Sequence, residues 1–562
     1  MVSLKSKDTR CSLCSLACFL RLSESPHGYL EPDYRTDVPE LRRGVCNRGN
    51  MTAELLAHIR RIDAAKFCGE ETRQVPLEEA IRSLAGTVQA SRTTLLIDGN
   101  LPAEDIAAAL ALAAGSHGKI AASVYLPTED EMVLEGLAAS RARLLTPENL
   151  AECDAILIVG DAFATHPVIS KPVHALRKRN VRTPLVVLDS LPGRTSIFAT
   201  HPLLVRPGTE SRVLAALAGK SGVRDLGVLS CEVGRAASES GLPEGALAAA
   251  AAAVAGAKKL GVLVRAEIGK AANWDQIGLL SGLIASAKAG GVTACLTYGN
   301  ALGAYRLARA AGARLDQPGE TVIVLGTDVV SVLSRQECNR TLDGIRTLVA
   351  AAQLPTLTLG AADVVLPLAF NFEAGGTTVT GSGEVITVES LAEAPGEAVP
   401  AGELVMRLAH AMGLRGVERK VDRSVLETMP EVDVRAIIER GHPQVAKAPE
   451  GAFLAVTASD AIHFHTGGRT SHCEWPKYMA PNPVATMNVD DAGPLGIKSG
   501  DEVLLVSNEG EGRATAEVVK TQAAGVVAVS SGFAEMRRLF PWNMARRTGP
   551  VAVKIQKAGS ET

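Results

Sequence analysis

The run AILIVGDA at residues 155–162 has the form of a buried parallel strand that ends in a tight turn. Its apolar residues are followed by Gly and Asp, where such a strand passes into a loop and then a crossover helix. Runs of the same form recur at residues 93–100, 184–190, 260–266, 293–300 and 321–328, with Ala- and Leu-rich stretches between them. This alternation predicts an α/β protein with two doubly wound, Rossmann-like units.

The regions on either side of these strands have a different composition, so we expect five parts. Residues 1–70 contain a cluster of cysteines, and residues 71–225 and 226–415 form the two α/β units. Residues 416–449 are charged and contain prolines, as is typical of a connector. Residues 450–562 contain short strands separated by Gly and Asn turns, which predicts a C-terminal β-barrel.

Charge and hydropathy exclude several classes of protein. The chain has 58 Lys and Arg against 61 Asp and Glu, so it has no bulk positive field for nucleic acid. Its longest apolar run, at residues 246–257, is shorter than the roughly 20 residues that span a bilayer. The first residues, MVSLKSKDTRC, carry charges where a signal peptide is apolar. We therefore expect a cytoplasmic protein with no membrane span, whose cysteines are metal ligands or buried thiols rather than disulfides.

Four cysteines form the pattern C-x2-C-x3-C-x27-C: Cys11, Cys14, Cys18 and Cys46. Four thiolates suit a tetrahedral zinc ion or a cubane 4Fe–4S cluster. Structural zinc usually has two matched C-x2-C pairs, so three close cysteines and a distant fourth favour the iron–sulfur cluster. Unligated thiols are the remaining alternative.

These cysteines and several later motifs resemble the molybdopterin oxidoreductase family, which includes formate dehydrogenase. LVVLDSLPGRTSIFATHPLLVRPGTE (185–210) is similar to the family's DPR-x-T block and PGTD turn, and AADVVLP (361–367) resembles its ADVVLP segment. HFHTGGRTSH (463–472) and the GPLGIKSGDEV stretch (493–503) resemble its dinucleotide-binding domain. The resemblance extends over nearly the whole chain. It implies a double-psi-type barrel and a molybdopterin guanine dinucleotide that holds molybdenum or tungsten.

The resemblance also implies a small substrate such as formate and an electron-transfer partner subunit. Arg48 stands where the family usually has a lysine that relays electrons between cluster and pterin.

Gly turns at strand ends let backbone N–H groups approach phosphates, and acidic side chains can accept from guanine or ribose. On this basis, and by resemblance, the cofactor-binding residues are Gly160, Asp161, His166, Asp189, Gly208, Thr209, Glu210, Gly299, Asn300, Gly326, Thr327, Asp328, His465, Thr466, Gly467, Arg469, Thr470, Asn488, Asp491 and Asn543. Each of them also fits the simpler interpretation of an ordinary α/β loop residue.

The family's metal-ligating residue is missing from its usual loop. Residues 116–132 correspond to that loop, and no cysteine occurs between Cys68 and Cys153. Ser123, Glu129 and Asp130 are the oxygen donors available there.

Three functions therefore remain open. The first is a formate dehydrogenase-like oxidoreductase that passes electrons from its metal site through the cluster to a partner. The second is a subunit that has lost the metal ligand and serves as an electron conduit or scaffold, similar to the large iron–sulfur subunit of respiratory complex I. The third is a fused formylmethanofuran dehydrogenase-like subunit.

Overall fold

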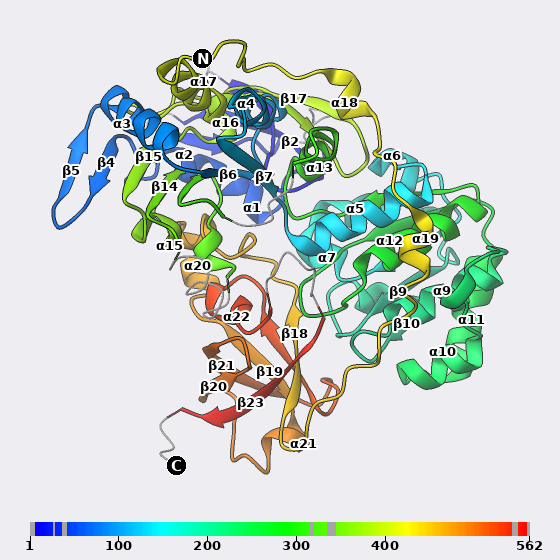
Figure 1. The fold of residues 1–562 in the computed structure, drawn as a ribbon. Helices are drawn as coiled ribbons and strands as arrows, with labels where there is room; N and C mark the ends of the chain where they lie inside the picture. Colours follow the sequence, from blue (N-terminus) through cyan, green and yellow to red (C-terminus); the bar gives the residue numbers. More distant parts are fainter. Residues whose placement is uncertain are drawn as a thin grey trace.

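The computed structural model describes residues 6–25, 29–35, 37, 42–313, 318–333, 344–541 and 549–558. Two sheets flanked by helices lie side by side, and a barrel sits beneath them (Figure 1). No helix among the described residues is both long and apolar enough to cross a membrane.

The N-terminal cysteines lie on a small antiparallel sheet of β1 (Ser6–Arg10), β2 (Phe19–Glu24) and β3 (Leu30–Pro32). Cys11, Cys14 and Cys18 occupy the loop between β1 and β2, which is closed where Cys11 N–H donates to the carbonyl of Cys18 at 2.8 Å. Cys46 immediately precedes α1 (Asn47–Asn50), which is followed by α2 (Thr52–Leu56). The loop packs on the rest of the protein through Ser15, whose hydroxyl donates to the Ala294 carbonyl.

The five-stranded sheet has the order β10-β9-β8-β11-β12, and all its strands are parallel. Its strands are β8 (Ala155–Val159), β9 (Leu185–Asp189), β10 (His201–Leu204), β11 (Leu260–Val264) and β12 (Gly291–Ala294). The associated helices include α5 (Thr128–Ser140), α6 (Pro147–Leu150), α7 (Ala162–Thr165), α8 (Ser170–Arg179), α9 (Glu210–Lys220), α10 (Val233–Ser240), α11 (Glu244–Ala255) and α12 (Trp274–Ala287). Because β8, β9, β11 and β12 are buried along their whole length, their sequences are continuous apolar runs rather than alternating ones.

The seven-stranded sheet has the order β5-β4-β15-β14-β13-β6-β7. Its strands are β4 (Ala65–Cys68), β5 (Thr72–Val75), β6 (Thr93–Asp98), β7 (Ile120–Tyr125), β13 (Thr321–Leu325), β14 (Thr347–Ala352) and β15 (Val364–Pro367). Only β4 and β5, at one edge, run antiparallel to their neighbours. Around it lie α3 (Leu77–Ala90), α4 (Ala103–Gly115), α13 (Ala301–Ala310), α15 (Leu357–Gly360), α16 (Asn371–Ala374), α17 (Ala401–Ala411) and the hairpin of β16 (Gly376–Val379) and β17 (Val385–Val388).

The sheets do not follow the predicted boundary between residues 225 and 226. Strand β6 pairs with β13, so β6 and β7 share a sheet with β13–β15 from beyond that boundary, whereas β8 pairs with β11 and joins β8–β10 to β11 and β12. The predicted N-terminal module also loses β4 to the seven-stranded sheet. The sequence shows each strand but not its neighbour, because pairing is decided by packing between segments that lie far apart in the chain.

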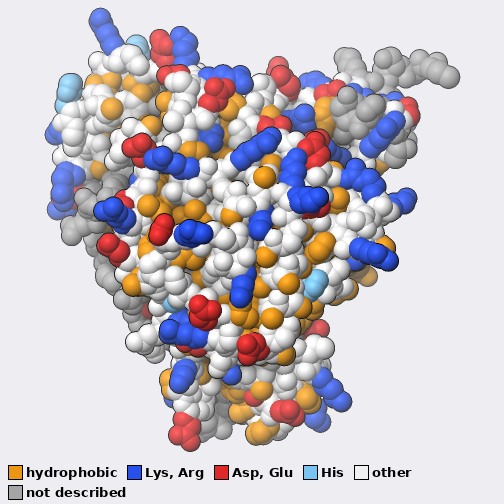
Figure 2. Space-filling view, turned by 90° about the vertical axis from the view of Figure 1, so that its right-hand side faces the viewer, with side chains coloured by type: hydrophobic (Ala, Val, Ile, Leu, Met, Phe, Trp, Pro, Cys, Tyr) orange, Lys and Arg blue, Asp and Glu red, His pale blue; other side chains and the backbone are white. Residues whose placement is uncertain are grey.

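The C-terminal domain is a closed barrel with the order β18-β22-β19-β21-β20-β23, which confirms the predicted barrel. The strands are β18 (Phe453–Ala458), β19 (Val484–Asn488), β20 (Glu502–Val506), β21 (Glu511–Val519), β22 (Val526–Ser530) and β23 (Val551–Lys557). Helices α20 (Glu474–Met479), α21 (Val489–Ala492) and α22 (Ala534–Arg537) connect them, and α18 (Arg423–Glu427) and α19 (Val434–Ile438) lie in the connector before it. The side of the molecule that carries α10 and α11 mixes basic, acidic and hydrophobic side chains (Figure 2).

Candidate functional site

Two small cavities lie where the strand order of each sheet reverses, which is where open α/β sheets bind their ligands. The first, which we call the β8–β11 cavity, measures about 20 Å³ and is lined by Arg48, His166, Arg265 and Arg537 among others. The second, the β6–β13 cavity, measures about 40 Å³. His465, from the loop after β18 in the barrel, lines both of them. The barrel therefore closes the loop ends of both sheets.

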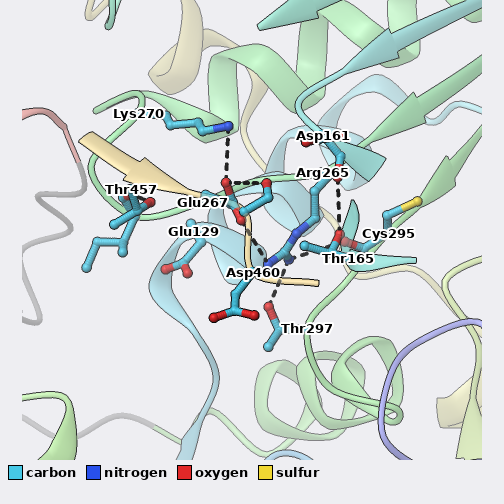
Figure 3. Close-up of polar contacts among 12 residues, drawn as sticks. Glu129, Asp161, Thr165, Arg265, Glu267, Lys270, Cys295, Thr297, Thr457 and Asp460 are labelled. Atoms are coloured by element: carbon cyan, nitrogen blue, oxygen red, sulfur yellow. Dashed lines mark hydrogen bonds and ion pairs between the residues drawn. The ribbon is translucent and has the colours of Figure 1, made fainter. Parts of the chain in front are cut away.

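A network of buried ion pairs reaches the β8–β11 cavity through Arg265 and Glu267. Arg265 follows β11, and its Nη1 donates to Thr297 Oγ1 at 2.9 Å and lies 3.4 Å from Asp130 Oδ1. Lys270 Nζ lies 2.9 Å from Asp189 Oδ1 and 3.1 Å from Glu267 Oε2. Figure 3 shows Arg265, Glu267 and Lys270 together, with Glu129 and Asp460 beside them.

Burial shifts the titration of this network. It raises the pKa of Asp130 to about 7, although Arg265 opposes the shift. Burial alone would lower the pKa of Lys270, but the carboxylates of Asp189, Glu267 and Asp161 outweigh it and raise that pKa, so Lys270 is charged. The positive charge of Arg265 at the cavity thus lies next to one carboxyl group, that of Asp130, which can take up a proton near neutral pH.

His465, at the two cavities, has an unusual backbone conformation and an unusual environment. It has a φ of +53°, a conformation that costs about 1–3 kcal/mol for a residue other than glycine. Its Nε2 is buried and has no hydrogen-bond partner among the described residues. Its ring contacts Tyr298 edge-on, with centroids 5.4 Å apart. Burial and the charge of Arg537 hold its pKa well below the usual value, so it presents a neutral imidazole to the cavities.

The four N-terminal thiols lie close enough to affect one another's charge. Burial and, after it, the neighbouring Cys46 raise the pKa of Cys14 to about 11. The pKa of Cys18 is raised by burial and then by Cys14, Cys11 and Cys46. Among the residues that the structure describes, however, no three His, Cys, Asp or Glu side chains are positioned around one point as metal ligands. The thiols are a fitting donor set for an iron–sulfur cluster, and the cluster itself stays a prediction.

Arg48 connects these thiols to the β8–β11 cavity. Its charge lowers the pKa of Cys11 and Cys14, against the larger effect of burial. Its Nη1 donates to the Thr165 carbonyl at 3.0 Å and its Nη2 to the Asp460 carbonyl at 2.5 Å. Arg48 is 7% exposed and lines the cavity. One fixed guanidinium therefore lies between the cysteine loop and the cavity.

The structure brings several of the predicted cofactor residues to the cavities. Those that line them are His166, Gly326, Thr327, Asp328, His465, Thr466 and Arg469. Gly160 follows β8 with a φ of +82°, and a Cβ there would collide with the Arg265 carbonyl. Gly299 and Gly467 are also in tight backbone contacts, with Ser12 and Gly532.

Other predicted residues have structural partners. Asp161 accepts from the Thr195 N–H and hydroxyl, and Asp189 holds Lys270. Asn300 is bonded to the Leu101 carbonyl and the Val379 N–H, and Thr470 Oγ1 accepts from Phe464 N–H. Gly208 and Thr209 form the turn before α9, where Glu210 is buried with neither carboxylate oxygen hydrogen-bonded within the described chain. Glu210 is buried and lines neither cavity.

The structure does not bring Asn488 and Asp491 to either cavity. Asn488 accepts from Asp490 N–H and donates to the Gln522 carbonyl, and Asp491 accepts from Gly525 N–H. They lie at α21, at the end of the barrel away from the sheets (Figure 1). Their hydrogen bonds fit the simpler interpretation of loop residues that fix the barrel. Asn543 lies outside the described residues.

The structure shows where the three oxygen donors of residues 116–132, the segment without a cysteine, are placed. Ser123 lies within β7, whereas Glu129 lines the β8–β11 cavity 3.6 Å from Arg537. Asp130 accepts from Thr297 N–H at 2.7 Å. Glu129 is therefore the one of these three that faces the cavity. Arg265, Glu267, Lys270 and Arg537 were missed from the sequence, although the charged RAEIGK directly after a buried strand was a signal for the first three.

Comparison with known proteins shows what this chain and its architecture are similar to. Residues 453–559 match the model of the molydopterin dinucleotide binding domain. Acetylene hydratase from Pelobacter acetylenicus has the same fold, with a TM-score of 0.72 and 13% identity over 98% of this chain and 100% of its own.

The chain is also similar to a formate dehydrogenase alpha subunit of Methanocaldococcus jannaschii, with 26% identity over 261 residues. An NADH-quinone oxidoreductase subunit of Rhizobium meliloti is 25% identical over 238 residues. The matches cover 39% and 38% of this chain, and 38% and 27% of those relatives. Together these findings confirm the resemblance to the molybdopterin oxidoreductase family that the sequence motifs indicated.

Proposed function

We propose that this chain is the cluster- and pterin-binding subunit of a formate dehydrogenase-like oxidoreductase. Cys11, Cys14, Cys18 and Cys46 would hold a 4Fe–4S cluster. When bound, a pterin-held molybdenum or tungsten centre would supply two-electron exchange with a small substrate, and the cluster would allow single electrons to pass to a partner subunit. The observation that carries this proposal is the position of Arg48, whose charge acts on the cysteine thiols and whose side chain lines the cavity.

The chain's own residues define what each part of the site does. Arg469 and Thr466, at the β6–β13 cavity, would supply donors and acceptors for the pterin nucleotides. His465 presents a neutral ring nitrogen, and Glu129 presents a carboxylate beside Arg537. Because none of the described residues that line the two cavities is a cysteine, an oxygen donor such as Glu129 would replace the thiolate at the metal.

The two cavities are too small to hold a pterin dinucleotide. Ligand pockets usually measure about 300–1,000 Å³, whereas the two cavities measure about 20 and 40 Å³. A pterin dinucleotide enters only if the barrel and its His465 loop move away from the sheets.

The same observation favours a second candidate function. A subunit that has lost the metal ligand would fill its central site with its own ion pairs, as Arg537 and Glu129 do here. It would then serve as an electron conduit or scaffold.

Metal and pterin content separate the two candidates. Anaerobically purified protein from a pterin-competent host should contain about four irons per chain, lost in Cys14→Ser, under both candidates. Molybdenum or tungsten with released pterin supports the oxidoreductase, and iron without pterin supports the conduit. Stoichiometric zinc without iron would contradict both.

The role of Arg48 has its own test. Arg48→Gln should lower the midpoint potential of the cluster by about 50 mV or more, because a buried positive charge favours the reduced cluster. Arg43→Gln is the matched control, since Arg43 also acts on Cys18 but is half-exposed and paired with Glu148. Equal shifts in both variants, measured by potentiometric titration, would refute a special position for Arg48.

A further inference from the structure

A third cavity lies on the outside of the fold, between α13 and α18, and it measures about 550 Å³. Its size is within the range of small-molecule sites. Ala308, Ala313 and Pro430 give it apolar walls, and Arg306 and Arg309 give it two guanidinium groups. None of the residues predicted from the sequence lines it, so it is separate from the site described above.

Arg306 is the feature of this cavity that calls for a ligand. It is 4% exposed, and its Nε is buried without a hydrogen-bond partner among the described residues. Its Nη1 donates to the Leu426 carbonyl, which is a neutral acceptor. Buried charges in proteins are normally paired, because an uncompensated one costs several kcal/mol.

The nearby carboxylates do not provide that pairing. Glu427 lies close enough to act on Arg306, but its carboxylate binds Arg423 at 2.7 Å. Arg309 lies 3.7 Å from Glu135, at the outer limit of an ion pair. Glu431 is the one acidic residue among the described residues that line the cavity. Burial lowers the pKa of Arg306 to about 10, as is typical of a cation without a close counter-ion.

We propose that this cavity binds a small organic anion, with its carboxylate or phosphate group on Arg306 and Arg309 and its apolar body against the alanine and proline wall. The guanidinium fork suits either head group. This site goes beyond the proposed redox function and does not depend on it.

The test uses two probes of the same shape, 4-fluorobenzoate and its neutral amide, with binding to the full-length protein followed by fluorine NMR. The benzoate should bind at about 1 mM or tighter at low ionic strength and about tenfold more tightly than the amide. 4-Fluorophenyl phosphate in a third arm tells which head group the site prefers. Equal binding of acid and amide, or no binding of any anionic probe, would overturn the proposal.

Variants locate the binding. Arg306→Gln should weaken benzoate binding about tenfold. Because loss of a buried arginine can impair folding, Ala310→Trp provides a second variant: Ala310 is exposed at the cavity wall, and the indole should fill the space and abolish binding. Arg346→Gln, far more exposed and outside the cavity, is the matched control and should bind as the unmodified chain does. Unchanged binding in Ala310→Trp would place the anion elsewhere and refute the site.

Discussion

Replacing Lys270 with Met should destabilise the five-stranded sheet strongly. Lys270 is 2% exposed and pairs with Asp189 at 2.9 and 3.1 Å and with Glu267 at 3.1 Å. Removing the cation leaves two buried carboxylates without compensation, which costs about 3–5 kcal/mol. In a unit of about 150–250 residues, this corresponds to a fall of about 6–20 °C in the midpoint of thermal unfolding.

The structure supplies a local reporter for this experiment. Trp274 is buried, and its indole Nε1 donates to the Glu267 carbonyl at 3.2 Å. With Trp475 and Trp542 replaced by Phe, the fluorescence of Trp274 follows the unfolding of this sheet alone. Lys259→Met is the control, because Lys259 pairs with Glu152 at the surface and its loss should cost less than about 1 kcal/mol.

The pH dependence of this loss of stability tests whether the missing ion pairs cause it. Burial raises the pKa of Asp189, and removing Lys270 takes away the charge that opposes this shift. A carboxyl with a raised pKa in the folded state is tolerated when protonated, so the penalty of Lys270→Met should be smaller at pH 5 than at pH 8. Asp189→Asn in the same chain should restore much of the lost stability. A loss no larger than that of Lys259→Met, or one independent of pH, would refute the ion-pair reasoning.

Two other changes test single features of the site. Burial raises the pKa of Glu210 to about 8, so the natural chain loses stability as the pH rises from about 4.5 to 8. Glu210→Gln removes this titration, and the variant should be more stable than the natural chain by about 2–4 kcal/mol at pH 8, with little gain at pH 5. Thermal unfolding at the two pH values measures the difference. Gly160→Ala should lower the free energy of unfolding by about 3 kcal/mol or more, because a Cβ would collide with the Arg265 carbonyl. Gly118→Ala is the control: Gly118 also has a φ of +82° but has open space around it, so the change should cost only about 1 kcal/mol. Similar losses for the two variants in urea unfolding would mean that the contact with Arg265 relaxes.

The strands and the barrel could be predicted because their signals are local. A buried parallel strand is an apolar run that ends in Gly or Asp, and β8, β9 and β13 all fit this description. The division into units could not be predicted in the same way. Two sheets share the chain, and the crossover from β7 to β8 changes sheet without any local signal that distinguishes it from a crossover within one sheet.

Local sequence signals were also insufficient to assign roles to single residues of the candidate site. Asp161 and Asp189 stand at strand ends, as a nucleotide-binding residue would, but so does any carboxylate that fixes a loop. What separates them from Glu210 is the presence of a partner: Thr195 for Asp161, Lys270 for Asp189, and none in the described chain for Glu210. Those partners come from other loops, so only the folded arrangement reveals them.

The ion pairs also set the condition under which an anionic cofactor can bind. Arg265, Arg537 and Arg469 each lie within 4 Å of a carboxylate, on Asp130, Glu129 and Asp98 respectively. A phosphate that recruits one of these arginines must release its carboxylate into a buried setting, where the charged form is costly. Because Asp130 has a pKa of about 7 even beside Arg265, it can take up a proton at that moment. We therefore expect anion binding at this site to be coupled to proton uptake and to weaken as the pH rises above 7.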